Sequence, residues 1–332
     1  MKIIDEIHKE EIDSMVVLNP NNIAYLSGFR PSSFSILILK DEPLLLTSKM
    51  EFEDASLKTD IPVEELKSLE KIKDYLTGTV GIERDITLEI YKRLKIGSVF
   101  EVKMIDAIER LRNIKSREEV QNIKKAIDIA ESAIKNVEFD FQKSENQIAA
   151  QIEYNMRIMG SKKASFETIV ASGKRSSLPH ASVSDNALDM PVVIDWGATY
   201  NNYCSDTTRT IIETEKQEEI FEIVLEAQKS AIDVIKPGIK ASYVDKVARN
   251  VIEEYGYGDY FLHSTGHGVG LEVHEGLSLS KSESGKLEKD MVITVEPGIY
   301  LKDEFGVRIE DMVLIKNNAK VLNKIKTNME IK

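Results

Sequence analysis

Hydrophobic periodicity divides the chain into two parts. Before about residue 112, short apolar runs alternate with helical stretches, which is typical of an α/β fold. Strands are expected at residues 15–18, 35–40, 43–47, 79–83 and 99–103, and helices at 61–75 and over ITLEIYKRL. We therefore predict a smaller α/β N-terminal domain over residues 1–112.

From residue 113 onward, the apolar residues follow longer helical patterns separated by strand-like runs. Ser116 and Glu119 have the spacing of a capping box, and apolar residues then recur at helical spacing. Further helices are expected from Ser144 toward Gly160, over about 215–235 and over about 242–255, and a hairpin is expected to turn at Asn317 and Asn318. A second domain, of mixed α+β type, is predicted over residues 113–332.

Composition narrows the class of protein. With 42% hydrophobic residues the chain can bury a large core, and its net charge of −12 argues against binding nucleic acid through phosphate neutralisation. The single cysteine, Cys204, excludes an internal disulfide framework and is expected to be a small buried residue. The N-terminus is polar and acidic, unlike a signal peptide, and the apolar runs are too short to span a bilayer. A cytoplasmic protein with no membrane partner is expected.

The most unusual stretch is LHSTGHGVGLEVHEG at residues 262–276, which holds His263, His267 and His274, three of the chain's five histidines. Its glycines, which lack a Cβ, allow backbone and ligand to approach closely; they are Gly266, Gly268 and Gly270. Taken alone, the stretch also fits a loop with structural histidines. The acidic residues elsewhere in the chain favour a chemical role.

Four acidic residues each interrupt or end a strand-like apolar segment: Asp195, Asp206, Glu296 and Glu310. Ionised carboxylates are rarely buried without a compensating positive charge. Buried salt bridges would require more cations than Arg209 and Arg308 provide, so a metal site explains the pattern better. Carboxylates with one imidazole suit two divalent ions, and manganese, iron, cobalt or zinc fits this ligand set.

At these residues the chain resembles the pita-bread metallopeptidases, the creatinase/aminopeptidase fold family of methionine aminopeptidases, aminopeptidase P and prolidase. The matching segments, in the family's order, are VIDWGATYNNYCSDTTRT, HSTGHGVGLEVHE, VEPGIY and VRIEDMVLI. The resemblance implies a bent antiparallel sheet with two helix pairs. It also implies that Asp195 binds one ion bidentately, that His267 and Glu296 hold the other, and that Asp206 and Glu310 bridge the two ions.

The resemblance also supplies the expected catalytic residues. His180, His263 and His274 match histidines that face the substrate, although a histidine after proline, such as His180, also fits a structural role. Arg308 would be a partner of the bridging carboxylates. The expected reaction is attack on the scissile carbonyl by a metal-activated water, with Glu296 or a bridging carboxylate accepting the proton and His263 or His274 hydrogen-bonding the intermediate.

The segment NPNNIAYLSGF at residues 19–29 resembles the N-terminal domain of prolidase, aminopeptidase P and creatinase. This selects their branch of the family, in which the N-terminal domain commonly helps to form a dimer, and so implies a homodimer. The modest length and the compact N-terminal domain resemble prolidase within that branch, which implies hydrolysis of the bond preceding proline in Xaa-Pro dipeptides. The loop SGFRPSS is a candidate lid over a neighbouring active site. The alternative is that Phe29 and Arg30 form a surface turn before Pro31.

One departure from the family pattern keeps a second specificity open. After VHE, the family usually has a proline with a basic residue close by, whereas this chain has Gly276, Leu277 and Ser278. A dipeptide's carboxylate would then need Lys281, or Arg30 of the partner subunit. The alternative function is removal of the N-terminal residue from longer Xaa-Pro peptides, as by aminopeptidase P. A non-catalytic binding protein or a metal-free creatinase-like hydrolase would also fit the fold, but the complete ligand set argues against both.

Overall fold

The computed structural model describes residues 2–95 and 100–329, and the chain folds into two compact units, Met1–Arg112 and Asn113–Lys332. Each unit has its own hydrophobic core. No helix in the described part of the chain combines the length and apolar character needed to cross a membrane. The candidate chemistry lies in the second unit, so the first is treated briefly.

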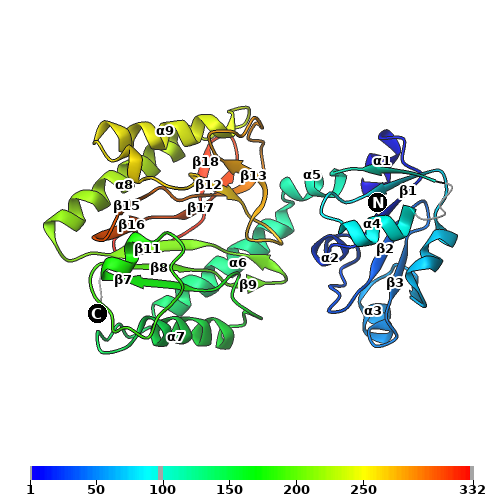
Figure 1. Cartoon of the computed structure of the whole chain (residues 1–332), viewed down its shortest axis with the longest axis horizontal. Helices are drawn as coiled ribbons and strands as arrows, with labels where there is room; N and C mark the ends of the chain where they lie inside the picture. Colours follow the sequence, from blue (N-terminus) through cyan, green and yellow to red (C-terminus); the bar gives the residue numbers. More distant parts are fainter. Residues whose placement is uncertain (1, 96–99, 330–332) are drawn as a thin grey trace. The chain divides into compact units, whose positions relative to one another are not determined.

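Within its described residues, the first unit holds one mixed six-stranded sheet in the order β4-β3-β2-β1-β5-β6 (Figure 1). Its strands are β1 (Ser14–Val17), β2 (Ile36–Leu39), β3 (Leu44–Thr47), β4 (Val63–Glu65), β5 (Thr79–Ile82) and β6 (Glu101–Met104). Its helices are α1 (Lys2–Lys9), α2 (Pro20–Ser27), α3 (Phe52–Lys58), α4 (Leu88–Lys95) and α5 (Ala107–Asn113). The predicted α/β pattern is therefore confirmed for this unit.

The helix predicted over residues 61–75 is wrong. The segment instead forms strand β4 and a 3₁₀ helix, η1 (Leu69–Tyr75). Pro62 and Val63 favour extended backbone, and Val63 pairs in parallel with Leu45 at the edge of the sheet, so a tertiary contact outweighs the local helical pattern. In the strand predicted over 99–103, Val99 lies outside the described residues.

The loop that follows α2 is held by a buried acid. Glu51 accepts hydrogen bonds from the backbone N–H and the hydroxyl of Ser32 and of Ser33, at 2.6 to 3.2 Å. Phe29 is only 1% exposed, so its interpretation as part of a surface turn is wrong. Arg30 donates to Asn21 Oδ1 at the start of α2. The loop is therefore fixed to its own unit at several points.

The second unit is built on antiparallel strands. A three-stranded sheet has the order β11-β8-β7, and a five-stranded sheet has the order β13-β12-β14-β17-β18, both within the described residues. Their strands are β7 (Ile169–Ser172), β8 (Val192–Trp196), β11 (Thr207–Ile211), β12 (Gly266–Gly268), β13 (Glu275–Leu279), β14 (Val292–Val295), β17 (Asp311–Ile315) and β18 (Ala319–Val321). Two short pairs accompany them: β9 (Thr199–Tyr200) with β10 (Tyr203–Cys204), and β15 (Gly298–Leu301) with β16 (Phe305–Arg308).

Two helix pairs cover these sheets (Figure 1). Helices α6 (Arg117–Ile134) and α7 (Glu145–Ile158) pack on a core that includes Val170, Ile194 and Trp196, while α8 (Glu215–Asp233) and α9 (Ala241–Glu254) pack on the core beneath β14 and β16.

The capping box predicted at Ser116 is confirmed, and Ser144 and Thr214 form two more. The helices predicted at 144–160, 215–235 and 242–255 and the hairpin at 317–318 are confirmed. Short 3₁₀ helices η2 (Gly173–Ser177) and η3 (Gly258–Tyr260) lie in the connections.

Candidate metal centre and active site

The four acidic residues lie at the ends of paired strands. Asp195 is on β8 and Asp206 directly precedes β11, and these two strands pair antiparallel. Glu296 directly follows β14 and Glu310 directly precedes β17, which form a second antiparallel pair. The two pairs are joined where the amide of Glu310 donates to the carbonyl of Thr208 at 3.1 Å. Sheet pairing therefore gathers carboxylates that are far apart in sequence.

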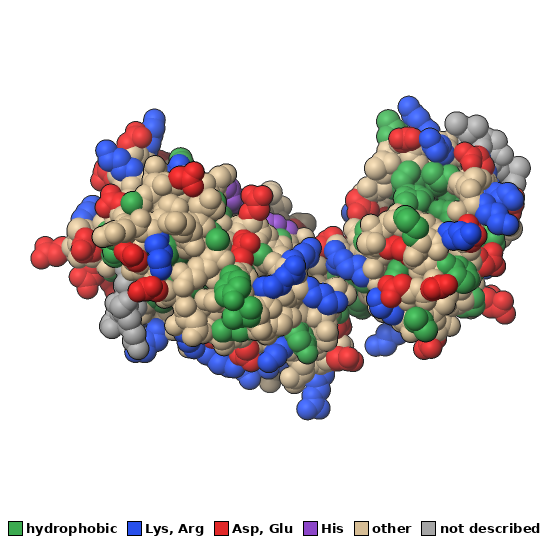
Figure 2. All heavy atoms as spheres, turned by 90° about the horizontal axis from the view of Figure 1, so that it is seen from below, with side chains coloured by type: hydrophobic (Ala, Val, Ile, Leu, Met, Phe, Trp, Pro, Cys, Tyr) green, Lys and Arg blue, Asp and Glu red, His purple; other side chains and the backbone are tan. Residues whose placement is uncertain are grey.

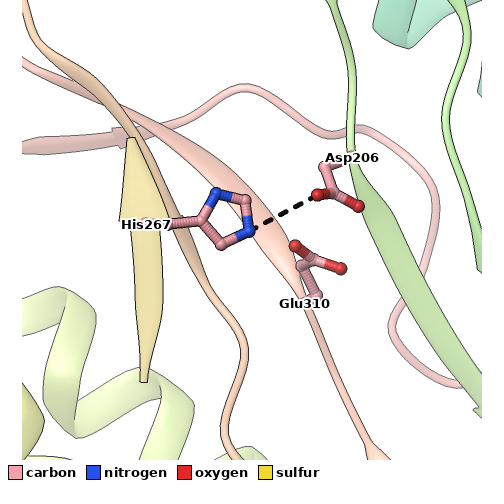
Figure 3. A group of neighbouring side chains, drawn as sticks. All are labelled: Asp206, His267 and Glu310. Atoms are coloured by element: carbon pink, nitrogen blue, oxygen red, sulfur yellow. Dashed lines mark ion pairs between the residues drawn. The ribbon is translucent and has the colours of Figure 1, made fainter. Parts of the chain in front are cut away.

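Among the described residues, Asp206, His267 and Glu310 form a group of possible metal ligands (Figure 3). One ligand atom from each lies within 4.8 Å of those of the other two. Nε2 of His267 lies 3.6 Å from Oδ2 of Asp206 and 3.2 Å from Oε1 of Glu296. Three of the carboxylates expected to bind metal therefore lie around the His267 ring, which comes from β12.

Burial and mutual repulsion make this group electrostatically costly. Burial raises the pKa of Asp206 well above its usual range, and the charge of Glu310 raises it further. Burial likewise raises the pKa of Glu310 well above its usual range, with the charge of Glu296 adding to the effect. Burial also acts to raise the pKa of Glu296, but the hydrogen bond and charge of His267 lower it to about 2. Carboxylates so placed favour a cation between them.

The buried arginines do not supply that cation. Arg209 pairs with Asp311 at 2.6 Å, and Arg308 pairs with Asp195 at 2.6 Å. Arg308 was expected to partner the bridging acids, but its carboxylate partner is Asp195, 113 residues away in sequence. Since Thr208 lies across the strand pair from Asp195, Arg308 also donates to the Thr208 hydroxyl at 3.1 Å. Among the described residues, neither arginine forms an ion pair with Asp206 or Glu310, and these two carboxylates lie beside the imidazole of His267.

The residues present fit a divalent metal. Oδ1 of Asp195 and Oε1 of Glu310 are buried side-chain oxygens without a hydrogen-bond partner among the described residues. Such atoms are costly unless something else binds them. Nδ1–H of His267 donates to the carbonyl of Gly268 at 3.2 Å, which directs Nε2 toward the carboxylates. A backbone carbonyl on the distal nitrogen is the usual partner of a metal-bound histidine.

These ligands open into a cleft of about 1030 Å³ in the second unit. Its lining contains the five expected ligands, Arg308 and the three other histidines of the predicted site, His180, His263 and His274. Histidine side chains are visible at the surface of this unit beside acidic ones (Figure 2). The rings of His267 and His274 stand edge to face with their centroids 4.1 Å apart. The predicted site residues are thus brought together in one place.

Tyr300, on β15, is a site residue that the sequence reasoning missed. Its hydroxyl lies 2.8 Å from Nε2 of His263 and 2.8 Å from Nη1 of Arg308. Nδ1–H of His263 donates to the carbonyl of Ser264, and burial lowers the pKa of His263, so this ring is neutral and accepts from Tyr300 at Nε2. The signal was available in the segment VEPGIY, where Tyr300 follows Glu296 by four residues. Both nitrogens of His263 are occupied by the protein itself.

The glycines of the histidine-rich stretch allow neighbouring parts of the protein to approach closely. A Cβ on Gly266 would clash with the carbonyl of Thr294, and one on Gly268 or Gly270 would clash with Glu275. These glycines are therefore required for the close approach of neighbouring backbone and side chains. Cys204 is buried, as predicted.

Comparison with known proteins identifies the family. Residues 121–317 match metallopeptidase family M24, and residues 1–114 match the creatinase/prolidase N-terminal domain. The chain is 45% identical to an Xaa-Pro dipeptidase of Pyrococcus furiosus, over 97% of each protein. The chain therefore belongs to metallopeptidase family M24.

Solved structures agree with this assignment. The prolidase from Pyrococcus furiosus is similar at a TM-score of 0.91 and 44% identity, covering 97% of this chain and 99% of that one. An X-Pro aminopeptidase from Thermotoga maritima is similar at a TM-score of 0.92 and 36% identity, covering 99% of this chain and 98% of that one. The predicted pita-bread fold with a smaller N-terminal α/β domain is confirmed, as is the assignment as a metallopeptidase. The family implies divalent metal ions.

Proposed function

We propose that this protein hydrolyses the peptide bond preceding proline in Xaa-Pro dipeptides, using two divalent ions of manganese, cobalt, zinc or iron. The observation that carries the proposal is the convergence of Asp206, His267 and Glu310 within 4.8 Å at a cleft with unsatisfied buried carboxylate oxygens. The likeness to Xaa-Pro dipeptidases over nearly the whole chain supports the substrate class. Residues 1–112 would be the N-terminal domain and 113–332 the catalytic domain of a homodimer.

In this proposal Asp195, Asp206, His267, Glu296 and Glu310 would hold the ions. When bound, the ions would supply a water of lowered pKa and a Lewis acid for the substrate carbonyl. Arg308 keeps Asp195 in place through its 2.6 Å ion pair. The carboxylate of Glu296 lines the cleft, and the hydroxyl of Thr294 orients it by donating a hydrogen bond to Oε1 at 3.1 Å. In this proposal Glu296 or another carboxylate of the centre would accept the proton of the attacking water.

The three other histidines of the cleft would have different roles. His274 lines the cleft and is exposed there, and its place beside the ligand His267 suits it to hydrogen-bond the developing oxyanion. His180, also exposed in the lining, would protonate the leaving prolyl nitrogen. His263 would support the site through Tyr300, because its own ring nitrogens are already bonded.

A second candidate function is removal of the N-terminal residue from longer Xaa-Pro peptides. Arg308 is the one lysine or arginine among the described residues lining the cleft, and it is committed to Asp195, Tyr300 and Thr208. The strand after His274 offers Gly276 and Ser278 where a basic residue would receive a dipeptide's carboxylate. A cleft without a free cation has little means of selecting for that carboxylate.

One comparison tests both functions. Initial rates are measured for an Xaa-Pro dipeptide, for the same dipeptide with an amidated C-terminus, and for an Xaa-Pro tripeptide. A dipeptidase cleaves the free acid best, whereas the second candidate predicts equal or faster cleavage of the amide and the tripeptide. The Asp206→Asn variant is the control for contaminating peptidases. If the metal-loaded protein cleaves none of the three substrates, both proposed functions are wrong.

A further inference from the structure

A buried ion pair joins the start of the second unit to the histidine-rich stretch. Nζ of Lys115 lies 2.9 Å from Oε1 of Glu275, and the two side chains are only 2% and 6% exposed. The residues are 160 positions apart in sequence. Lys115 does not line the cleft, whereas Glu275 does.

An ion pair at such a depth is a poor source of stability. Removing both charges from water carries a large free-energy cost, which their mutual attraction offsets only with good geometry and further hydrogen bonds. Those bonds are present here, because Oε2 of Glu275 accepts from the amide of Glu272 at 3.2 Å and Nζ of Lys115 lies 3.4 Å from the carbonyl of Asn113. The ion pair therefore has the geometry and the additional hydrogen bonds that a buried pair requires. Its position suggests a role in holding the neighbouring segment in place.

Glu275 is linked through the backbone to two histidines of the site. It directly follows His274, and its backbone pairs with Gly268, which directly follows the proposed ligand His267. The hydrogen bond from Glu272 closes the turn that carries His274, from residue 272 to residue 275. A shift of the Glu275 carboxylate would consequently move the His274 ring.

The surrounding glycines leave room for this arrangement. A Cβ on Gly268 would clash with the carbonyl of Glu275, and a Cβ on Gly270 would clash with its carboxylate. Gly276, at a φ of +69°, has the left-handed conformation that glycine adopts readily, and a Cβ there would clash with Asn113. The segment is thus packed closely against both Glu275 and the chain next to Lys115.

We propose that Lys115 is a positioning residue for the reaction: through Glu275 it fixes the turn that holds His274 over the cleft. The inference rests on the proposed function, in which His274 contacts the substrate. Because Lys115 itself is outside the cleft, its loss should change turnover rather than substrate binding. A misplacement of about 1 Å can reduce a rate about a hundredfold.

The first test is kinetic. Lys115→Met should lower kcat about tenfold or more with KM within about twofold, and Lys115→Arg should restore most of the rate. In a His274→Ala background, Lys115→Met should have little further effect, because the residue through which it acts is gone. Lys324→Met, which removes an exposed lysine paired with Asp128, is the matched control and should leave kcat unchanged.

Independent effects of Lys115 and His274 on kcat would overturn the proposal, as would an unchanged kcat in Lys115→Met. If Lys115→Met does not fold because Glu275 is left as an unpaired buried charge, the double variant Lys115→Met/Glu275→Gln removes both charges at nearly constant volume. This variant should fold and retain the loss of kcat. A double variant with wild-type kcat also contradicts a positioning role.

The second test does not require activity. The chain has five histidines, so the ring signals of a histidine-labelled, zinc-loaded protein can be resolved by NMR. Lys115→Met should shift the His274 signal, leave that of His8 unchanged and leave the zinc content equal to that of the wild type. An unshifted His274 signal would overturn the positioning role. If the wild type cleaves no Xaa-Pro substrate, the proposed function fails, and this measurement alone decides the inference.

Discussion

The hydroxyl of Tyr300 donates a hydrogen bond to Nε2 of His263 over 2.8 Å. The same oxygen accepts from Nη1 of Arg308, and Nη2 of this arginine donates to Oδ2 of Asp195. Burial raises the pKa of Tyr300 to about 12, so the hydroxyl remains a donor throughout the physiological range. This continuous chain of bonds links a histidine of the cleft to a carboxylate of the proposed metal centre.

Tyr300→Phe should therefore reduce kcat about ten- to hundredfold while the metal content stays that of the wild type. The substitution removes the donor to His263 and an acceptor of Arg308, which frees both groups to reorient. Steady-state kinetics and metal analysis on the same sample measure the effect. Tyr255→Phe is the matched control, because it deletes an exposed hydroxyl bonded to Glu226. Equal kcat values for the two variants would contradict the assignment.

Metal removal should abolish activity, and Asp206→Asn should do nearly the same. The two treatments should have opposite effects on stability. Removing the metal should lower the stability of the wild type, whereas Asp206→Asn should raise the stability of the metal-free protein, because the asparagine relieves the repulsion from Glu310 that the chelated wild type retains. We expect the metal-free variant to melt several degrees above the metal-free wild type. Thermal unfolding with and without EDTA measures this, with Asp128→Asn, a partly exposed acid outside the proposed metal centre, as the control. Full turnover by a metal-free sample would refute the proposed mechanism.

Glu51 should make the stability of the first unit depend on pH. Burial acts to raise its pKa, but hydrogen bonds from Ser32 and Ser33 lower it to about 2. A carboxyl whose pKa is lower in the folded state stabilises the fold above its unfolded value of 4.5, and this stabilisation is lost as pH falls from there to about 2. The contribution at neutral pH is at most about 3 kcal/mol.

Urea unfolding of the wild type and of Glu51→Gln at pH 6 and pH 3 tests this expectation. Circular dichroism should show a large difference in the free energy of unfolding between the two proteins at pH 6 and a smaller one at pH 3. The acidic residues of the proposed metal centre are the same in both proteins, so their contribution to the free energy of unfolding cancels in this comparison. Glu42→Gln, an exposed acid of the same unit, is the control. A difference that is the same at both pH values would contradict the role given to Glu51.

Glu145→Ala should destabilise the second unit by about 2–4 kcal/mol. The buried carboxylate accepts hydrogen bonds from the amides and hydroxyls of Ser172 and Ser184 and from Arg175, which surround the segment carrying His180. Unfolding followed by the fluorescence of the single tryptophan, Trp196, reports on this unit. Glu138→Ala, an exposed acid, should change the stability by less than about 0.5 kcal/mol. The expectation fails if Glu145→Ala unfolds like the control.

The sequence anticipated the helices of the second unit because their apolar spacing and caps are local signals. Ser116 and Ser144 both cap helices at the residues where the pattern begins. It did not anticipate β4, because Val63 becomes a strand residue only through its pairing with Leu45. The same limit applied to Glu51, whose partners come from a loop almost twenty residues earlier.

By itself, the sequence determined the family and the set of side chains that lie in the cleft, because the identity and the order of the motif residues are properties of the sequence alone. Only the tertiary structure decided which groups are partners: Arg308 with Asp195, Tyr300 with His263, and Lys115 with Glu275. Each of these pairs joins different segments of the folded chain. Hydrogen bonds and ion pairs act over about 3 Å, so their partners are fixed by the packing of strands and turns and cannot be read from spacing along the chain.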